Sequence, residues 1–321
     1  MILAPLRGVT VRCFRRVFAE VIAEAGFSEA VTPFVSAMPG VDPLADRELR
    51  GGPAAEPACL RVTPQFIGKD PAAFSFCLAR IREVGYETAD LNCGCPFPMV
   101  RRKGRGSGLL RSPDALRRML DAGCAAMGDG RLSVKARLGV ERSDELLGLM
   151  PILNEYPLRF LAVHARTALQ MYDGEVDAAA LEAVRSAAKM PVVANGDLDW
   201  QGGEGMVGRS FVRALGGRGD IGELLRRYID ASRDELCGER PVLGRIKELV
   251  SYWRGLPQWR RRWNVVKICA SLDELRAIGC TETFMHEGAV CQHHRNSTYT
   301  VPYVPACPIC AYGATTNPAW R

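Results

Sequence analysis

The sequence predicts an α/β fold, a TIM (β/α)8 barrel followed by a small all-helical domain. Three observations carry this prediction: eight short apolar runs, helical patterns between most of them, and a change to purely helical patterns after residue 216. Repeated βα units predict a parallel sheet, and eight of them predict a closed barrel. We therefore expect a barrel over residues 1–216, a helical domain over 217–279 and a tail containing Cys and His over 280–321.

The candidate strands are short and often rich in β-branched residues. In chain order they are 2–6, 29–37, 60–68, 89–94, 132–139, 160–166, 191–197 and 205–209. Helical patterns lie at 11–26, 70–85, 112–127, 144–156 and 177–189. Asp70 and Ser112 each precede a proline, which is typical of an N-cap residue followed by the first helical position.

The seventh βα unit is unusually short. Only residues 198–204, rich in glycine, separate the last two candidate strands. A crossover between parallel strands usually needs about a dozen residues, so this connection is too short for a covering helix. We expect a truncated seventh unit that leaves one flank of the barrel without its helix.

Composition describes a globular, non-membrane protein. The 321 residues are 47% hydrophobic and 24% charged, and no segment approaches a membrane span. The N-terminal residues carry no charged leader, so we expect a cytoplasmic protein whose twelve cysteines are reduced thiols. We also expect it to be monomeric.

Positive charge is concentrated in one window of the chain. Residues 240–267 contain eight basic residues and one acid, and this +7 accounts for the net charge of +6. Helical patterns at 221–236, 245–256 and 267–279 surround the window. Such a concentration suits a polyanionic partner, although a solvated helix face would show the same pattern.

The segment DLNCGCP, residues 90–96, places two cysteines one residue apart at the end of a strand. A metal site usually has two intervening residues, so this spacing does not favour metal. Gly94 and Pro96 interrupt the strand, and Cys95 should therefore leave the sheet at its carboxyl end. In α/β proteins that end usually carries the chemistry. Cys95 could be a nucleophile, an acid or a packed side chain.

Polar residues collect where the other strands end. They are Asn92, Lys135, Arg137, His164, Arg166, Asn195, Asp197, Gly208 and Arg209. Together they predict a cationic, hydrogen-bonding ring at the barrel mouth, with a phosphate site after the last two strands. A ligand with a phosphate tail and an electron-accepting head fits this ring, and FMN is the obvious candidate.

These motifs as an ordered set resemble the tRNA-dihydrouridine synthases. The matching pieces are LAPLRGVT (3–10), PQFIG (64–68), DLNCGCP (90–96), RKGRGSGLL (102–110), VKARLG (134–139), VHARTALQMYDG (163–174), PVVANGD (191–197) and MVGR (206–209). The helical segment RIKELVSYWRGL (245–256) resembles that of the bacterial class that modifies uridine 16 in the D-loop of tRNA.

The resemblance implies an FMN-dependent oxidoreductase in which NADPH reduces the flavin, which passes hydride to C6 of a flipped-out uracil. Cys95 matches the cysteine that protonates C5, so it should be a neutral thiol, and Cys93 should only pack. The residues implied to bind FMN are Pro5, Gln65, Lys135 and His164 at the ring, and Asn195, Asp197, Gly208 and Arg209 at the ribityl phosphate. Those implied to contact the substrate tRNA are Asn92, Arg137, Tyr172 and Arg166 near the uracil, and Arg245 and Lys247 in the helical domain.

Two positions depart from the resemblance. Arg7 stands where the family often has an acidic residue, and the truncated unit lies inside the predicted phosphate site. The loop at 103–108 does not directly follow a strand and lacks dinucleotide-loop spacing, so we expect it to be a mobile cover over the site.

The tail contains a possible zinc set, Cys291, His293 or His294, Cys307 and Cys310. Because the spacing of its first half is irregular, we favour a tail without metal.

Two other functions stay open. A flavin reductase acting on free pyrimidines would share the barrel and the chemistry but would not need the basic helices. A non-catalytic tRNA-binding protein with a damaged flavin site would keep those helices.

Overall fold

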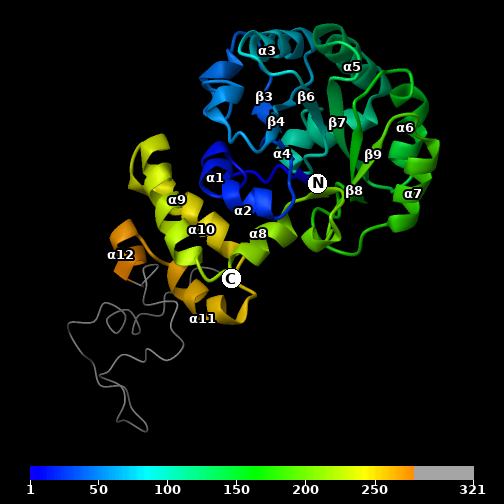
Figure 1. Ribbon diagram of the computed structural model, residues 1–321. Helices are drawn as coiled ribbons and strands as arrows, with labels where there is room; N and C mark the ends of the chain where they lie inside the picture. The colour runs from blue at the N-terminus through cyan, green and yellow to red at the C-terminus, as the bar shows by residue number, and fades with distance from the viewer. Residues whose placement is uncertain (278–321) are drawn as a thin grey trace, which may run out of the picture.

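The computed structural model describes residues 1–277, and its barrel is built only of parallel strands (Figure 1). Each predicted strand overlaps at least one observed strand: β1 (Ile2–Leu3), β2 (Glu29–Val31), β3 (Val35–Ser36), β4 (Arg61–Thr63), β5 (Gln65–Ile67), β6 (Ala89–Cys93), β7 (Leu132–Gly139), β8 (Leu161–Thr167), β9 (Val192–Asn195) and β10 (Met206–Val207). The sequence prediction of the strands is therefore confirmed.

The sheet closes on itself. Its order is β3-β5-β6-β7-β8-β9-β10-β1-β2-β4, so β3 and β4 stand at the two ends. Strand β4 continues into β5 across Pro64, which lacks the N–H that a ladder needs, and β2 is followed by β3 after three residues. The backbone N–H of Thr32 donates to the carbonyl of Thr63 at 3.0 Å and bridges the junction. Joined in this way, the ten segments form the eight strands of a TIM barrel.

Helices cover most of the barrel. They are α1 (Arg12–Val17), α2 (Ala19–Glu24), α3 (Pro71–Glu83), α4 (Pro98–Arg101), α5 (Pro113–Met127), α6 (Glu145–Leu153), α7 (Ala178–Ala187) and α8 (Arg209–Leu215), with short 3-10 turns at η1 (Pro43–Ala45), η2 (Pro53–Ala55), η3 (Gly106–Arg111) and η4 (Trp200–Gly202). Both predicted N-caps are confirmed. The Asp70 carboxylate accepts the N–H of Ala72 at 2.9 Å, and the Ser112 hydroxyl accepts that of Ala115 at 3.4 Å.

The truncated seventh unit is confirmed. Only the turn η4 connects β9 to β10, and every residue of β9 is half-exposed, whereas every residue of β6 and β8 is buried. Leu198 and Trp200 supply part of the missing cover, since both pack on the apolar core beside the first and last strands. The Trp200 ring meets Phe211 of α8 edge-on, with ring centroids 6.3 Å apart.

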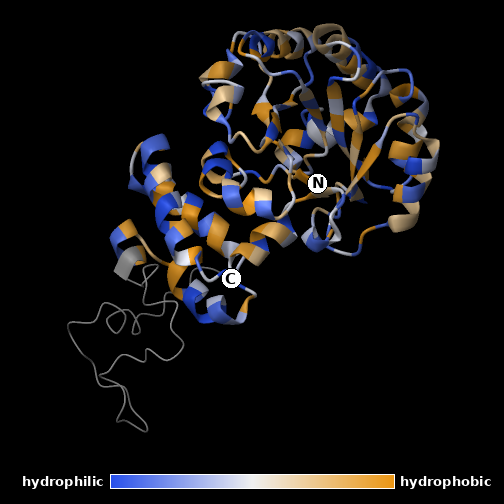
Figure 2. Ribbon diagram, viewed as in Figure 1, coloured by the Kyte–Doolittle hydropathy of each residue, from blue (hydrophilic) through white to orange (hydrophobic). Residues whose placement is uncertain are grey.

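The chain then forms α9 (Ile221–Glu235), α10 (Glu239–Ser251), α11 (Pro257–Val266) and α12 (Leu272–Ala277), of which α9 packs against α1 (Figure 1). Helix α10 begins before the predicted residue 245, and the arginine run forms α11, which the sequence pattern did not predict. Hydrophobic and hydrophilic residues alternate along these helices (Figure 2), and the buried apolar residues share one core with α1. Tyr228 lies 6.1 Å from Phe14 and 5.7 Å from Phe18, centroid to centroid.

Within residues 1–277, no helix is both long and apolar enough to cross a membrane. The same residues contain no cluster of His, Cys, Asp and Glu that could hold a metal ion. The candidate zinc ligands Cys291, His294, Cys307 and Cys310 lie outside the described residues.

Candidate active site at the carboxyl ends of the strands

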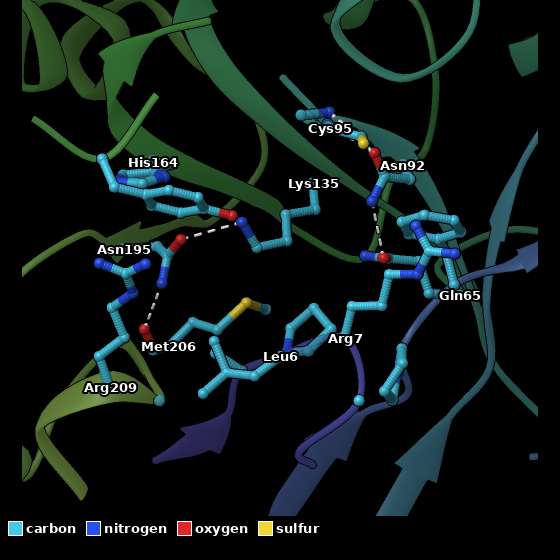
Figure 3. Close-up of a pocket in the computed structure, with 18 of the residues that line it drawn as sticks. Leu6, Arg7, Gln65, Asn92, Cys95, Lys135, His164, Asn195, Met206 and Arg209 are labelled. Atoms are coloured by element: carbon cyan, nitrogen blue, oxygen red, sulfur yellow. Dashed lines mark hydrogen bonds between the residues drawn. The ribbon is translucent and has the colours of Figure 1, made fainter. Parts of the chain in front are cut away.

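A cavity of about 670 Å³ opens at the carboxyl ends of the barrel strands and reaches α10 of the helical segment. Because parallel strands bring their carboxyl ends to one edge, residues distant in sequence meet here. The predicted site residues that line it are Pro5, Gln65, Asn92, Cys95, Lys135, Arg137, His164, Tyr172, Asn195, Asp197, Gly208, Arg209 and Arg245. Figure 3 shows many of these side chains pointing into the same space.

Cys95 stands just beyond the end of β6, as its flanking glycine and proline predict. The Asn92 side-chain oxygen accepts the backbone N–H of Gly94 at 3.1 Å and that of Cys95 at 2.9 Å, which turns the chain out of the strand. Cys95 is 6% exposed and lines the cavity. Cys93 is fully buried in the apolar core and does not line it, so the two cysteines occupy different environments.

The Cys95 thiol is neutral. Burial raises the pKa of this thiol above its ordinary value and outweighs the opposing effects of Arg7, Arg137 and Lys135. The expectation that Cys95 lies under no dominating cation therefore agrees with the structure. A proton stays on the sulfur at neutral pH, available for donation inside the cavity.

A chain of hydrogen bonds fixes Asn92. Its amide nitrogen donates to the Gln65 side-chain oxygen at 2.8 Å, and the Gln65 nitrogen donates to Asp90 at 2.8 Å (Figure 3 shows the first bond). Asp90 also accepts the Ser133 hydroxyl at 2.7 Å, and burial raises the pKa of Asp90 to about 6. A buried side-chain network on three neighbouring strands thus sets the orientation of the turn that carries Cys95.

The glycine-rich loop at residues 103–108 holds the backbone of Cys95. The Ser107 hydroxyl and backbone N–H donate to the Cys95 carbonyl at 2.9 and 3.2 Å. Gly106 has φ +58, and a Cβ there would lie 2.8 Å from that of Cys95. The expectation that residues 103–108 cover the cavity is wrong for residues 106–108. Residues 106–108 are buried against Cys95, because the absence of a side chain at Gly106 permits this close approach.

The wall formed by β7, β8 and β9 is cationic and polar. The Lys135 ammonium donates to the Asn195 side-chain oxygen at 2.9 Å, and the Asn195 nitrogen donates to the Met206 carbonyl at 2.7 Å (Figure 3). Burial, with Arg137 nearby, lowers the pKa of Lys135 to about 8. Burial together with the surrounding cations lowers the pKa of His164 to about 2, so its imidazole is neutral.

Tyr172 lies between two guanidinium groups. The Arg209 guanidinium carbon stands 4.0 Å from the ring centroid and that of Arg137 stands 5.3 Å away, both at cation–π distance. Arg137 is held by the carbonyls of Gly94 at 3.0 Å and Thr167 at 2.8 Å. The Tyr172 ring, with two cations close to it, offers an aromatic surface to a planar ligand in the cavity.

Three predicted basic residues have other partners. Arg166 is 3% exposed, does not line the cavity, and bonds the Gly174 carbonyl and the Asp197 carboxylate. Arg245 lines the cavity but pairs with Glu235 at 2.8 Å. Lys247 donates to the carbonyls of Lys267 at 3.1 Å and Cys269 at 2.5 Å, away from the cavity.

Comparison with known protein families shows which family has this sequence. The family model described as dihydrouridine synthase (Dus) matches residues 2–207. The chain belongs to the dihydrouridine synthase family.

Named relatives are consistent with this family. A "Probable tRNA-dihydrouridine synthase" of Rhodobacter capsulatus is 33% identical over 201 residues, which cover 62% of this chain and 60% of that protein. The "tRNA-dihydrouridine synthase B" of Vibrio cholerae is 32% identical over 200 residues, which again cover 62% of this chain and 60% of that protein. The protein of the same name from Serratia marcescens is 30% identical over 262 residues, which cover 78% of this chain and 74% of that protein. The first two alignments thus span 60% of the relatives' length. Among solved structures, morphinone reductase aligns at a TM-score of 0.44 and 11% identity over 66% of this chain and 82% of that one, too weakly to carry an argument.

Several cavity residues of this family member escaped sequence reasoning as site residues. They are Leu6, Phe34, Phe97, Met206, Leu236, Glu248 and Tyr252. Most are apolar and carry no chemical signature. The last three come from the end of α9, from α10 and from the residue after α10, whose placement over the barrel depends on tertiary packing. Arg7, noted only as a departure, also lines the cavity, and its guanidinium carbon lies 5.5 Å from the Phe34 ring centroid.

Proposed function

We propose that this protein is a tRNA-dihydrouridine synthase that reduces the C5–C6 bond of a D-loop uridine, at position 16, with NADPH through FMN. We place it in the cytoplasm as a monomer. The observation that carries the proposal is Cys95, a buried neutral thiol held by Asn92 at the edge of a cationic cavity. Membership of the family supports the reaction.

The residues present fit FMN. The cavity volume lies within the ~300–1,000 Å³ range of cofactor sites, and its donors are those an electron-accepting ring and a phosphate need. Pro5, Gln65, Lys135 and His164 would hold the ring, and Asn195, Asp197, Gly208 and Arg209 the ribityl phosphate. Gly208 lines the cavity and is tightly packed, because a Cβ there would lie 3.0 Å from that of Ala4.

When bound, FMN supplies the hydride that adds to C6 of the uracil. The protein's part is to hold the uracil and to deliver a proton to C5. Cys95 can make that delivery because its raised pKa keeps hydrogen on the sulfur. Arg137, fixed by two backbone carbonyls, would stabilise the charge that develops on the uracil oxygen.

The helical segment would bind the RNA. Arg254, Arg260 and Arg261 are exposed, and within the described residues none of them has an ion-pair partner. The phosphates of tRNA would supply the missing ion-pair partners. A base inside folded tRNA can reach the cavity only if the protein binds the RNA backbone and the base is extruded from its stack.

The test is expression of the full chain in cells that lack their own dihydrouridine synthases, followed by mapping of dihydrouridine at each tRNA position. We expect yellow protein and dihydrouridine in the D-loop, at position 16. A product confined to another uridine would overturn the choice of position, and no product at all would overturn the proposed activity.

One observation favours a second candidate, a tRNA-binding protein without catalysis. The truncated connection between β9 and β10 passes beside Asp197 and Gly208, where the phosphate of FMN would lie. Colourless protein that still binds tRNA, with no dihydrouridine formed, is the result expected of that candidate.

A further inference from the structure

The turn that follows Cys95 exposes two apolar side chains. Phe97 is 44% exposed and lines the cavity, and Met99, in the one-turn helix α4, is 82% exposed. We call Phe97 and Met99 the apolar tip. Met99 is the most exposed large apolar side chain in the described part of the chain. It stands only four residues from the thiol.

The backbone beneath the apolar tip is well supported. The Cys95 carbonyl accepts two hydrogen bonds from Ser107, and the N–H of Arg101 donates to the Phe97 carbonyl at 3.0 Å. Gly108 packs so tightly against α4 that a Cβ there would overlap the Arg101 carbonyl. Apolar side chains displayed by a fixed turn are better explained by a partner than by loose packing.

The surroundings of the apolar tip are strongly basic. Arg101, Arg102, Lys103 and Arg105 follow it directly, and no acidic residue occurs between Asp90 and Asp114. Arg102 and Lys103 are exposed, and neither has an ion-pair partner among the described residues. An apolar surface surrounded by free cations is complementary to nucleobases joined by phosphates.

We propose that the apolar tip stacks on the nucleobase next to the extruded uridine and fills the gap which that uridine leaves. This inference rests on the proposed function and adds the residues that hold the base open. Extrusion breaks the stacking on both sides of the uridine, and an apolar side chain inserted beside it replaces part of the lost contact. The cations of residues 101–105 then neutralise the flanking phosphates.

The test is a double-mutant cycle on binding, which needs no turnover. The protein is the full chain as wild type, as Phe97→Ala/Met99→Ala, and as Phe76→Ala, a control whose phenylalanine is also 44% exposed but lies on α3, outside the cavity. The RNA is an intact tRNA and a set of transcripts that each carry one abasic nucleotide in the D-loop. Dissociation constants are measured at one fixed salt concentration.

We expect the double variant to bind intact tRNA about 5- to 150-fold more weakly, the range typical of a lost base–aromatic contact, and Phe76→Ala to bind as wild type. The loss should vanish for the abasic transcript next to the target uridine, and Phe97→Trp/Met99→Leu should restore affinity. An equal loss on every transcript, or unchanged binding by a folded double variant, would overturn the inference. If the loss of affinity vanishes on that abasic transcript but the wild-type protein forms no dihydrouridine, the role of the apolar tip stands and only the proposed activity is overturned.

Discussion

The side-chain oxygen of Asn92 accepts the backbone N–H of Cys95 at 2.9 Å, and this bond links the buried frame of the barrel to the proposed acid. The Asn92 amide nitrogen is bound in turn to Gln65 at 2.8 Å. The position of the thiol therefore depends on side chains that bind the Cys95 backbone or one another. The rate of a reaction depends on such positioning when the proton donor must be aligned with the reacting atom.

Replacing Asn92 tests that dependence. Asn92→Ala leaves the N–H groups of Gly94 and Cys95 without their acceptor, so we expect the free energy of unfolding to fall by about 1–3 kcal/mol. We expect dihydrouridine formation to fall at least about tenfold. Asn154→Ala is the matched control, because Asn154 also bonds the backbone but lies between α6 and α7. Equal losses in both variants would contradict a special role for Asn92.

Alkylation with iodoacetamide tests the protonation state of Cys95. Because burial raises the pKa of this thiol, we expect its alkylation at pH 7.5 to be much slower than that of Cys59 and Cys237, which are exposed. Cys93, wholly buried, should be slower still. Peptide mass spectrometry over time measures the order. Cys95 reacting first would show a thiolate and would remove it as the proton donor.

The pKa of Lys135, lowered to about 8, predicts a pH-dependent affinity for FMN. Below pH 8 the side chain is cationic and attracts the anionic cofactor, and as the pH rises through 8 it loses its proton. We therefore expect the affinity, followed by quenching of flavin fluorescence, to fall between pH 7 and 9. The pKa of Cys95 is raised by burial and that of His164 is lowered to about 2, so both shifts move these groups away from this range. Lys135→Gln should bind FMN more weakly, and its affinity should not fall between pH 7 and 9. If the affinity of this variant still falls over that range, another group causes the pH dependence.

Gly106 offers a steric test of the support behind Cys95. In Gly106→Ala the new methyl would lie 2.8 Å from the Cys95 Cβ, so we expect the thiol to shift and dihydrouridine formation to fall about tenfold or more. Gly128→Ala is matched for backbone strain, because Gly128 has φ +85 but nothing within 4 Å. Both variants should be less stable than the wild type. Only Gly106→Ala should form less dihydrouridine than its remaining folded fraction accounts for. Similar activities in the two would mean that the loop does not position Cys95.

The strand pattern of the barrel was predictable because each βα unit leaves a local signature. Asp70 and Ser112 cap their helices where the proline after each indicates. The cavity residues contributed by strand ends were predictable for the same reason, since one edge of a parallel sheet collects them. The short connection after β9 was predictable from length alone.

The rest depends on tertiary packing. Nothing local in Gly106 indicates that it packs on Cys95 instead of covering the cavity, and nothing in Tyr252 indicates that α10 brings it to the barrel mouth. Lys247 belongs to a basic segment, but its ammonium is bound by the carbonyls that end α11. Charge pattern shows that a segment is basic without showing which cations are already paired.

The most direct test of the account compares Cys95→Ala with Cys93→Ala in cells without other dihydrouridine synthases, with dihydrouridine quantified at each tRNA position. The account predicts D-loop dihydrouridine with the wild type and with Cys93→Ala, and a loss of about a hundredfold or more with Cys95→Ala, because Cys95 lines the cavity and Cys93 does not. Undiminished product from folded Cys95→Ala would contradict it.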